Sequence, residues 1–303
     1  MNSKKWVFMS FLTSAICLFS IIVVVYLFNL NYYFNHNYLG LAKFSGDERK
    51  YKVNYIENNQ NSYDSILLGS SSTSFINEND FDDFKVFNFS VSGMIPIEYS
   101  QAIKYLESKN NKEIENIFLN IEFFTSNHNE VKRIKKTVNI DYISEKEEYD
   151  YLIKELLNLT ALKKIIIRST NFFEPKGETY YSRWDNIHHH INNLNKSTIN
   201  HRINKGIKAH ILELKKYKYN SNYKNELMEL KNNNLDKNFY TFITPVAKPY
   251  MDLIITERFN SFVRWLEETI EVFNNVYIYP YSNRITDNYL ETFRDNRHYN
   301  SST

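Results

Sequence analysis

The 303-residue chain predicts an α/β fold built on a parallel sheet of about five strands. Five short apolar segments recur along the chain, and segments with helical periodicity separate them. Strands that alternate with helices are typical of a parallel sheet covered on both faces, because each crossover carries a helix over the sheet. The length suffices for one sizeable domain with a real core. We therefore expect a three-layered α/β/α sandwich.

The first strand is expected near Ser65, where a short apolar run ends at Gly69. Between the second and third strands, Pro96 is expected to begin a helix, because proline is favoured at the first helical position. The third strand is apolar enough to lie centrally in the sheet. The other expected strands are 85–90, 116–124, 239–244 and 276–279. A further helix is expected at 251–273. The apolar face of the Pro96 helix is formed by Tyr99, Ala102, Ile103 and Leu106.

Residues 6–30 predict a membrane-spanning helix. They contain no charged side chain, and roughly 20 apolar residues are what a helix needs to cross about 30 Å of hydrocarbon. A cleaved signal peptide is the alternative, but its apolar region would cover about 7–15 residues and end at small residues. Lys4 and Lys5 precede the span, which favours a cytoplasmic N-terminus and an extracytoplasmic body. This division gives a cytoplasmic tail at 1–5, the anchor at 6–30, a linker at 31–60 and one domain at 61–303.

Charged, asparagine-rich helices are expected at about 126–236, notably at 145–167 and 222–235. No glycine-rich linker separates this stretch from its surroundings, so we expect an insertion within the domain rather than a separate domain. Its position after the third strand places it near the edge where open α/β sheets bind ligands. A lid, a substrate platform, a docking surface and a plain solvated cover remain open as its role.

Composition excludes several classes of function. Cys17 is the only cysteine and lies within the expected span, so the chain forms no internal disulfide and no cysteine-based metal cluster. The net charge of +2 gives no basic field that would attract nucleic acid. His188-His189-His190 is reminiscent of a metal site, but adjacent side chains on a helix diverge and do not converge on one ion. We expect neither a metal nor a cofactor.

A cluster of hydroxyl groups follows the first expected strand, in Gly69-Ser70-Ser71-Ser72-Thr73. A serine presented at that edge of a sheet is a nucleophile if a histidine reaches it. The segment Asp295-Asn296-Arg297-His298 supplies one. Its aspartate can hold one nitrogen of the imidazole while the other nitrogen faces the serine. The two segments together predict a Ser-His-Asp triad.

With Gly93, these segments resemble the SGNH (GDSL-type) family of serine esterases and acyltransferases, in the blocks Gly69-Ser70-Ser71, Gly93 and Asp295-x-x-His298. The resemblance implies a flavodoxin-like α/β/α fold. It also implies that Ser71 is the nucleophile, because Ser71 falls on the serine of the family pattern Gly-Asp-Ser, whereas Ser70 replaces the aspartate and is the reserve nucleophile. His298 would be the base, Asp295 its orienting group, and the N–H groups of Ser71 and Gly93 the oxyanion donors.

The chain departs from the family pattern in two places. The family takes a third oxyanion donor from an asparagine in a Gly-x-Asn-Asp block after the third strand, and this chain lacks the block. Asn120 lies within the expected strand and Asn127 beyond it, neither in a matching context. The family also has a final helix after the histidine, whereas this sequence ends at Thr303. The loop carrying Asp295 and His298 is therefore expected to be poorly anchored unless a partner holds it.

An anchored, outward-facing chain with these blocks resembles the branch that acylates envelope polymers, in teichoic-acid D-alanylation and in alginate or O-antigen acetylation. The resemblance implies an extracytoplasmic O-acyltransferase or esterase that adds or removes acyl groups, such as acetyl, on a cell-envelope glycan or lipid-linked acceptor. A multi-spanning membrane O-acyltransferase is the implied donor partner. A lipid or carbohydrate esterase is the alternative enzyme. A non-catalytic anchored scaffold of the same fold, within a polymer-modification complex, is the alternative outside enzymes.

Overall fold

The computed structural model divides the chain into two compact units, which we describe separately. The helical unit comprises Met1–Asn59 and Asp141–Asn186, and the sheet unit comprises Gln60–Ile140 and Ile187–Thr303. The helical unit thus contains the predicted anchor, nearly all of the predicted linker at 31–60 and part of the predicted insertion. The structure describes residues 3–39, 43–44, 47–59, 62–146, 150–163, 165–166, 179–182, 186, 188–190, 194–279 and 282–299.

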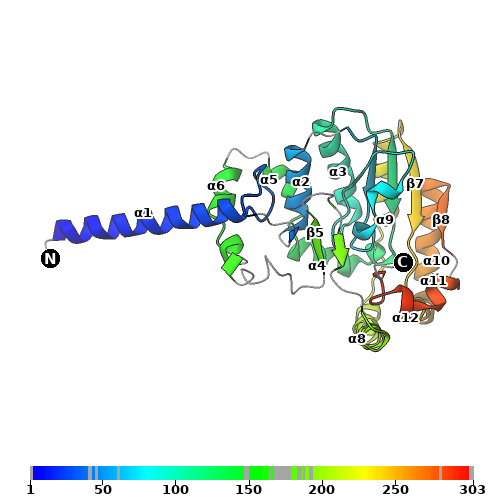
Figure 1. The fold of residues 1–303 in the computed structure, drawn as a ribbon. Helices are drawn as coiled ribbons and strands as arrows, with labels where there is room; N and C mark the ends of the chain where they lie inside the picture. Colours follow the sequence, from blue (N-terminus) through cyan, green and yellow to red (C-terminus); the bar gives the residue numbers. More distant parts are fainter. Residues whose placement is uncertain are drawn as a thin grey trace. The chain divides into compact units, whose positions relative to one another are not determined.

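The sheet unit is built on five parallel strands in the order β3-β2-β4-β7-β8, which confirms the predicted α/β fold (Figure 1). From β2 the chain passes first to β3 on one side and then to β4 on the other, so the direction of winding reverses between β2 and β4. In open α/β sheets, ligands bind outside the carboxyl ends of the strands at such a switch point. The strands are β2 (Ser65–Leu68), β3 (Val86–Asn88), β4 (Asn116–Asn120), β7 (Asn238–Ile243) and β8 (Val276–Ile278).

One face of this sheet packs on α-helices and the other on short helical turns. On the first face, the rings of Phe239 in β7 and Phe273 in α10 (Lys248–Phe273) are 5.3 Å apart. α10 also contacts α9 (Tyr223–Asn232), which in turn contacts α3 (Pro96–Lys109). On the second face, Leu67, Val86 and Phe118 form a buried cluster with Ile76, Phe81 and Phe84 from the segment that carries the 3-10 turns η1 (Thr73–Phe75) and η2 (Glu78–Asp80).

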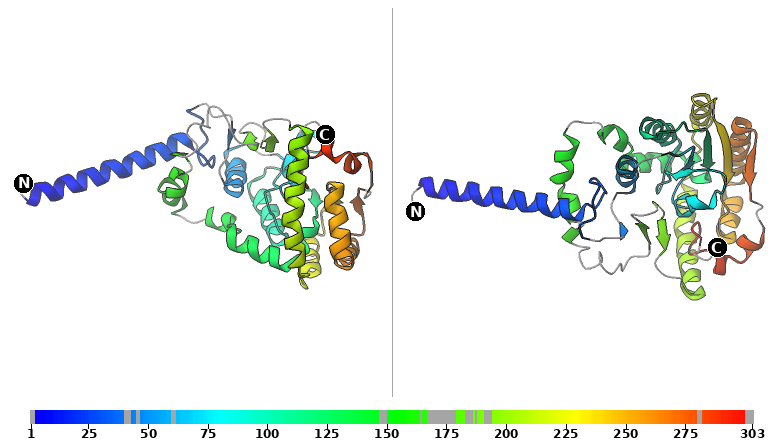
Figure 2. Two further views of the ribbon diagram at one scale, coloured as in Figure 1. Left: turned by 90° about the horizontal axis from the view of Figure 1, so that it is seen from below. Right: turned by 45° about the horizontal axis from the view of Figure 1, so that its top comes forward.

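The predicted apolar face of α3 is buried as expected, with Tyr99, Ala102, Ile103 and Leu106 all at or below 1 % exposure. The segment 223–232, which was expected in the insertion, is instead a core helix that leads into β7. α8 lies beside α10, and α12 packs on α8 near the end of the chain (Figure 2). The remaining elements of the sheet unit are η3 (Phe123–Ser126), α4 (His128–Thr137), β6 (His188–His190), α8 (Lys196–Lys215), α11 (Arg284–Asp287) and α12 (Tyr289–Thr292).

The helical unit begins with a long apolar helix. Among the helices that the structure describes, α1 is the one long and apolar enough to cross a membrane, in agreement with the span predicted from the sequence. In the same unit, Lys50 pairs with Glu155, and Lys146 Nζ lies 2.9 Å from a carboxylate oxygen of Glu57. Its elements are α1 (Ser3–Phe28), β1 (Lys43–Phe44), α2 (Glu48–Asn58), α5 (Tyr142–Lys146), α6 (Tyr151–Leu156) and β5 (Thr179–Ser182), with β1 and β5 antiparallel.

Candidate active site

The hydroxyl cluster forms a tight turn at the carboxyl end of β2. The carbonyl oxygen of Ser70 accepts hydrogen bonds from the N–H groups of Thr73 (3.1 Å) and Ser74 (3.2 Å), which close the turn around Ser71. The hydroxyl of Ser74 also donates to the carbonyl oxygen of Ser71 at 2.8 Å. Ser71 itself is partly exposed, whereas Ser70 and Ser72 are buried. The turn therefore leaves Ser71 as the most accessible of the three serines.

Gly69 is required by close packing rather than by an unusual backbone angle. Gly93 is the glycine with a positive φ among the described residues, so the special backbone angle that a glycine turn suggests for Gly69 is absent. A Cβ at position 69 would instead lie 2.2 Å from Oγ1 of Thr73 and 3.0 Å from Cβ of Asn120. A side chain at this position would push the Ser71 turn away from the end of the sheet.

The structure brings together Ser71, His298 and Asp295, which lie far apart in the sequence. The hydroxyl oxygen of Ser71 is 2.8 Å from Nε2 of His298. Nδ1 of His298 is 2.8 Å from Oδ2 of Asp295, while Oδ1 of Asp295 accepts hydrogen bonds from the N–H groups of Arg297 (2.8 Å) and His298 (3.0 Å). With the proton on Nδ1, Nε2 accepts the Ser71 proton, which is the arrangement of a serine nucleophile with its base.

The environment keeps Asp295 ionised. Burial raises the pKa of Asp295, but the hydrogen bond from His298, the attraction of that side chain and the two N–H donors lower it by more. The resulting pKa lies well below the usual range of an aspartate. The carboxylate thus holds the imidazole with Nδ1 toward it, an arrangement that can stabilise a positive charge on the ring.

The chain itself anchors the loop that carries Asp295 and His298, contrary to the expectation of a poorly held loop. The N–H of Arg294 donates to the carbonyl oxygen of His298 at 2.8 Å, which closes the loop. Beyond the histidine, the hydroxyl of Tyr299 donates to the carbonyl oxygen of Pro245 at 2.9 Å. Phe293, before the loop, is fully buried among side chains of α8, α11 and α12. Both ends of the loop are therefore fixed to the sheet unit.

Asn296 anchors the middle of the same loop to α8. Its backbone oxygen accepts from the N–H of Ala247 at 3.1 Å. Its carboxamide, oriented so that both atoms are paired, donates to the carbonyl oxygen of Ile203 (3.2 Å) and accepts from the N–H of Ile207 (3.1 Å). Gly206 makes room for this contact, because a Cβ there would lie 2.3 Å from the nearest carboxamide atom. Part of the expected insertion thus supports the loop that carries Asp295 and His298.

Two main-chain donors are free beside Ser71. Within the described part of the chain, the N–H groups of Ser71 and Gly93 donate no hydrogen bond. Gly93 has φ +65°, a left-handed conformation that glycine adopts without strain. The N–H of Val91 donates to the carbonyl oxygen of Gly69 at 3.3 Å, which holds the Gly93 loop against the Ser71 turn. Both residues predicted as oxyanion donors therefore have an N–H group available for a ligand.

The two asparagines considered as a third donor both make hydrogen bonds within the fold, through different atoms. Nδ2 of Asn120 is buried and donates to Oγ1 of Thr73 (2.6 Å), with Oγ1 of Thr244 at 3.2 Å. Oδ1 of Asn127 accepts from the N–H of Asn129 at 3.1 Å, as the cap of α4. The Nδ2 donor of Asn120 is therefore taken up within the fold, whereas for Asn127 it is the acceptor Oδ1 that has a structural role.

Sequence reasoning missed Glu122, which lies two residues after the end of β4. One carboxylate oxygen accepts from the hydroxyl of Ser72 at 2.6 Å, and the other accepts from the hydroxyl of Ser70. Glu122 therefore holds both neighbours of Ser71 across the switch point between β2 and β4. Its position just past β4 follows the same rule that points to Ser71, but the strand predicted from the sequence runs to residue 124 and so includes Glu122.

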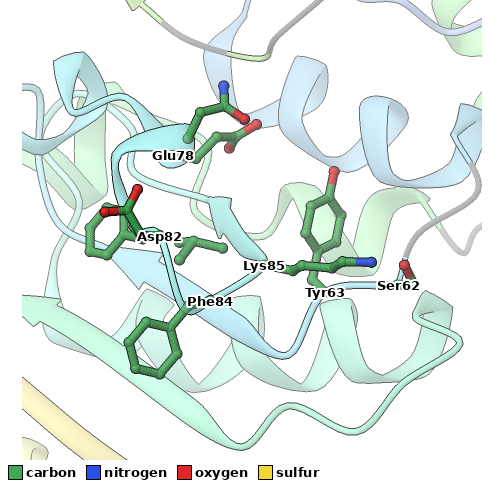
Figure 3. Close-up of a pocket in the computed structure, with 9 residues that line it drawn as sticks. Ser62, Tyr63, Glu78, Asp82, Phe84 and Lys85 are labelled. Atoms are coloured by element: carbon green, nitrogen blue, oxygen red, sulfur yellow. The ribbon is translucent and has the colours of Figure 1, made fainter.

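Two other candidate places lie away from this chemistry. His188, His189 and His190 form strand β6 rather than a helix, and among the described residues no three His, Cys, Asp or Glu side chains are grouped to hold a metal ion. A polar pocket lies beside the amino ends of β2 and β3, at the opposite edge of the sheet from Ser71 (Figure 3). Its lining includes Ser62, Tyr63, Glu78, Asp82, Phe84 and Lys85.

No family model, curated protein or solved structure matches the chain.

Proposed function

We propose that this protein is a membrane-anchored serine O-acyltransferase or esterase with Ser71, His298 and Asp295 as its catalytic residues. The observation that carries the proposal is the continuous chain of contacts from Ser71 Oγ to His298 Nε2 and from His298 Nδ1 to Asp295, each 2.8 Å long. The N–H groups of Ser71 and Gly93, which donate no hydrogen bond among the described residues, support the proposal, since acyl transfer also needs donors for the oxyanion.

In the proposed reaction, Ser71 Oγ attacks the ester carbonyl while Nε2 of His298 accepts the hydroxyl proton. The carbonyl oxygen becomes negative and binds the N–H groups of Ser71 and Gly93. His298 then returns the proton to the leaving alkoxide, and an acyl-serine remains. An acceptor hydroxyl, or water, attacks the acyl group with His298 as base, and the oxygen of Ser71 recovers its proton. The acceptor decides between transfer and hydrolysis.

The cell-envelope setting rests on α1 and on the resemblance of the motif blocks. Lys4 and Lys5 precede α1, which favours a cytoplasmic N-terminus and a sheet unit outside the cytoplasm. A cell-envelope glycan or lipid-linked acceptor is then the natural substrate, and a multi-spanning membrane O-acyltransferase the donor. Reporter fusions after residue 60 should be active outside the cytoplasm. Activity confined to the cytoplasm would rule out this setting.

Labelling of the full chain with a fluorophosphonate probe tests the chemistry, because the probe reacts with activated serines. Labelling is expected in the native chain and is expected to be lost in Ser71→Ala and in His298→Ala. A folded native chain that does not label would refute the enzyme and leave an anchored scaffold of the same fold.

A further inference from the structure

Four aromatic side chains lie in a strip on the sheet face opposite α10. Tyr240 and Phe242 of β7 pack on the buried cluster of that face. Tyr277 of β8 is paired with Phe242 in parallel register, so it points to the same face, and Tyr279 follows two residues later. We call Tyr240, Phe242, Tyr277 and Tyr279 the aromatic strip.

The outer half of this strip is exposed to solvent. The segment that covers the face contacts β7, where the ring of Phe84 lies 5.9 Å from that of Tyr240. Beyond β7, β8 is the last strand of the sheet, at its edge in Figure 1. There Tyr277 is 60 % exposed and Tyr279 is 53 % exposed. Neighbouring exposed aromatic rings that continue from a buried core are typical of a binding surface.

The strip carries hydroxyl groups but no charge. β7, β8 and Tyr279 contain no Lys, Arg, Asp or Glu. The hydroxyl groups of Tyr240, Tyr277 and Tyr279 make no hydrogen bond with the described part of the chain. A sugar ring has an apolar C–H face bordered by hydroxyl groups, so it packs on a tyrosine ring and exchanges hydrogen bonds with the hydroxyl group at its tip. The exposed surface thus fits a carbohydrate rather than an ion.

The strip is too small for a stable protein partner. A specific protein interface takes about 800 Å² and about 20–30 residues from each side. At β8 the exposed apolar side chains are Tyr277 and Tyr279 on this face and Ile278, 45 % exposed, on the other. A chain of sugar rings needs only a few aromatic contacts, each with one ring. A glycan is therefore the occupant that fits, and a second copy of this chain is the alternative that the experiment below tests.

The strip ends at the edge of the sheet that carries Ser71. All five strands are parallel, so the end of β8 before Tyr279 lies at the same edge as the end of β2 before the Ser71 turn. Neighbouring strands are about 4.8 Å apart, which puts β8 roughly 14 Å from β2 across β4 and β7. The carbonyl oxygen of Pro245, just after β7, accepts from the hydroxyl of Tyr299 at 2.9 Å, next to His298. A ligand that contacts both the strip and Ser71 is therefore a chain of several sugar residues.

From this arrangement we infer that the aromatic strip is a glycan-binding surface, which holds a polysaccharide chain by its sugar rings at a place outside the catalytic site. Recognition is by ring faces and hydroxyl groups and requires no charged group on the polymer. The inference deepens the proposed function and rests on it in one respect: the glycan on the strip is the polymer whose hydroxyl is acylated at Ser71. Holding the polymer near Ser71 raises the local concentration of acceptor hydroxyls, which favours transfer over hydrolysis.

Binding is measured with the full-length Ser71→Ala chain in phosphatidylcholine nanodiscs, so that no turnover occurs. Cellohexaose, chitohexaose and glucose are titrated by isothermal titration calorimetry, together with a glycerol phosphate oligomer that has no sugar ring. We expect a hexasaccharide to bind about tenfold or more tightly than glucose, since it contacts several rings at once, and the oligomer not to bind. Saturation-transfer NMR should show the ring C–H protons of the hexasaccharide as closest to the protein.

Substitutions in the strip then locate the binding surface. Adding Tyr277→Ala should weaken hexasaccharide binding about tenfold or more, whereas Tyr277→Phe, which keeps the ring, should weaken it only severalfold. Phe259→Ala removes an aromatic ring of similar exposure, 55 %, from α10 on the other face of the sheet. It is the matched control and should bind normally. Circular dichroism verifies the folding of each variant.

Failure of both hexasaccharides to bind, or equal binding with and without the Tyr277 ring, would overturn the glycan surface. A native chain that is dimeric by light scattering in detergent and becomes monomeric in Tyr277→Ala would overturn it in favour of an interface between copies. Fluorophosphonate labelling of the native chain decides the proposed function separately. A chain that binds the hexasaccharide but does not label would refute the enzyme and retain the glycan surface.

Discussion

Replacing Gly206 with alanine tests whether α8 supports the catalytic loop. Alanine is favoured over glycine inside a helix by about 0.8–1.0 kcal/mol, so helix propensity alone predicts a more stable protein. The structure predicts the opposite. The new Cβ would lie 2.3 Å from the carboxamide of Asn296, which is only 3 % exposed and cannot swing into solvent.

The expected loss has two parts. Overpacking a well-filled site costs about 1–3 kcal/mol. Displacing the carboxamide also removes its bonds to Ile203 and Ile207, each of which contributes about 0.5–1.5 kcal/mol. After the gain in helix propensity, Gly206→Ala should lower the free energy of unfolding by about 1–5 kcal/mol. Because Asn296 lies between Asp295 and His298, labelling of Ser71 by the fluorophosphonate should also slow.

Urea melts followed by circular dichroism give the stability, and the rate of probe labelling gives the state of the site. Lys205→Ala, at an exposed neighbouring position, is the control and should leave both nearly unchanged. A Gly206→Ala chain that is more stable than the native chain and labels at the native rate would refute the role assigned to α8.

Three further predictions concern the residues around the nucleophile. Ser71→Ala should abolish fluorophosphonate labelling whereas Ser70→Ala should retain part of it, and the reverse would move the nucleophile by one position. Glu122→Gln, which keeps the shape of the side chain but loses its charge, should slow labelling about 10²-fold by loosening the Ser71 turn. An unchanged rate would show that the turn keeps its conformation without the charge of Glu122. Because the folded-state pKa of Asp295 is lowered, its carboxylate stabilises the fold above its unfolded pKa of about 3.9, and this contribution is lost as pH falls through the folded pKa. The stability difference between the native chain and Asp295→Asn, from urea melts, should therefore be largest near neutral pH and shrink below about pH 4; a pH-independent difference would contradict this.

The parts of the fold that follow from local pattern were predicted well. All five strands of the sheet lie within the short apolar runs predicted as strands, and Ser71 follows the first of them. The Asp-x-x-His segment was also recognisable, because Asp295 binds N–H groups and a ring only two and three residues away. Such features depend on neighbours in the sequence and need no knowledge of the tertiary fold.

Apart from α1, the packing of the helical unit could not be predicted, because it depends on contacts between distant segments. α2 was taken for a linker since it lacks an apolar stripe, and the structure shows why: Arg49, Lys52 and Asn54 are among its buried residues. Nζ of Lys52 donates to the carbonyl oxygen of Asn186 at 2.9 Å, a partner 134 positions away. Buried polar groups with remote partners leave no periodic signal.

The supporting residues of the site were hidden for a similar reason. A glycine inside a helix normally indicates only a less stable helix. The role of Gly206 becomes visible only in the structure, where its lack of a side chain makes room for Asn296, a residue about 90 positions later in the chain. Glu122 serves two serines from the preceding loop, about 50 residues earlier. Ser71 and His298, which the structure places in contact, could be picked out from the sequence, whereas the residues that position them could not.

The central claim is that Ser71 and His298 act as one unit, and a double-mutant cycle tests it most directly. Initial rates of phenyl acetate hydrolysis are measured for the native full-length chain, Ser71→Ala, His298→Ala and the double variant, each with folding verified by circular dichroism. A serine hydroxyl is a poor nucleophile without its base, so each single variant should lose nearly as much rate as the double variant. If the two losses add on a logarithmic scale, or if His298→Ala keeps near-native activity, the 2.8 Å contact between the two residues is not catalytic.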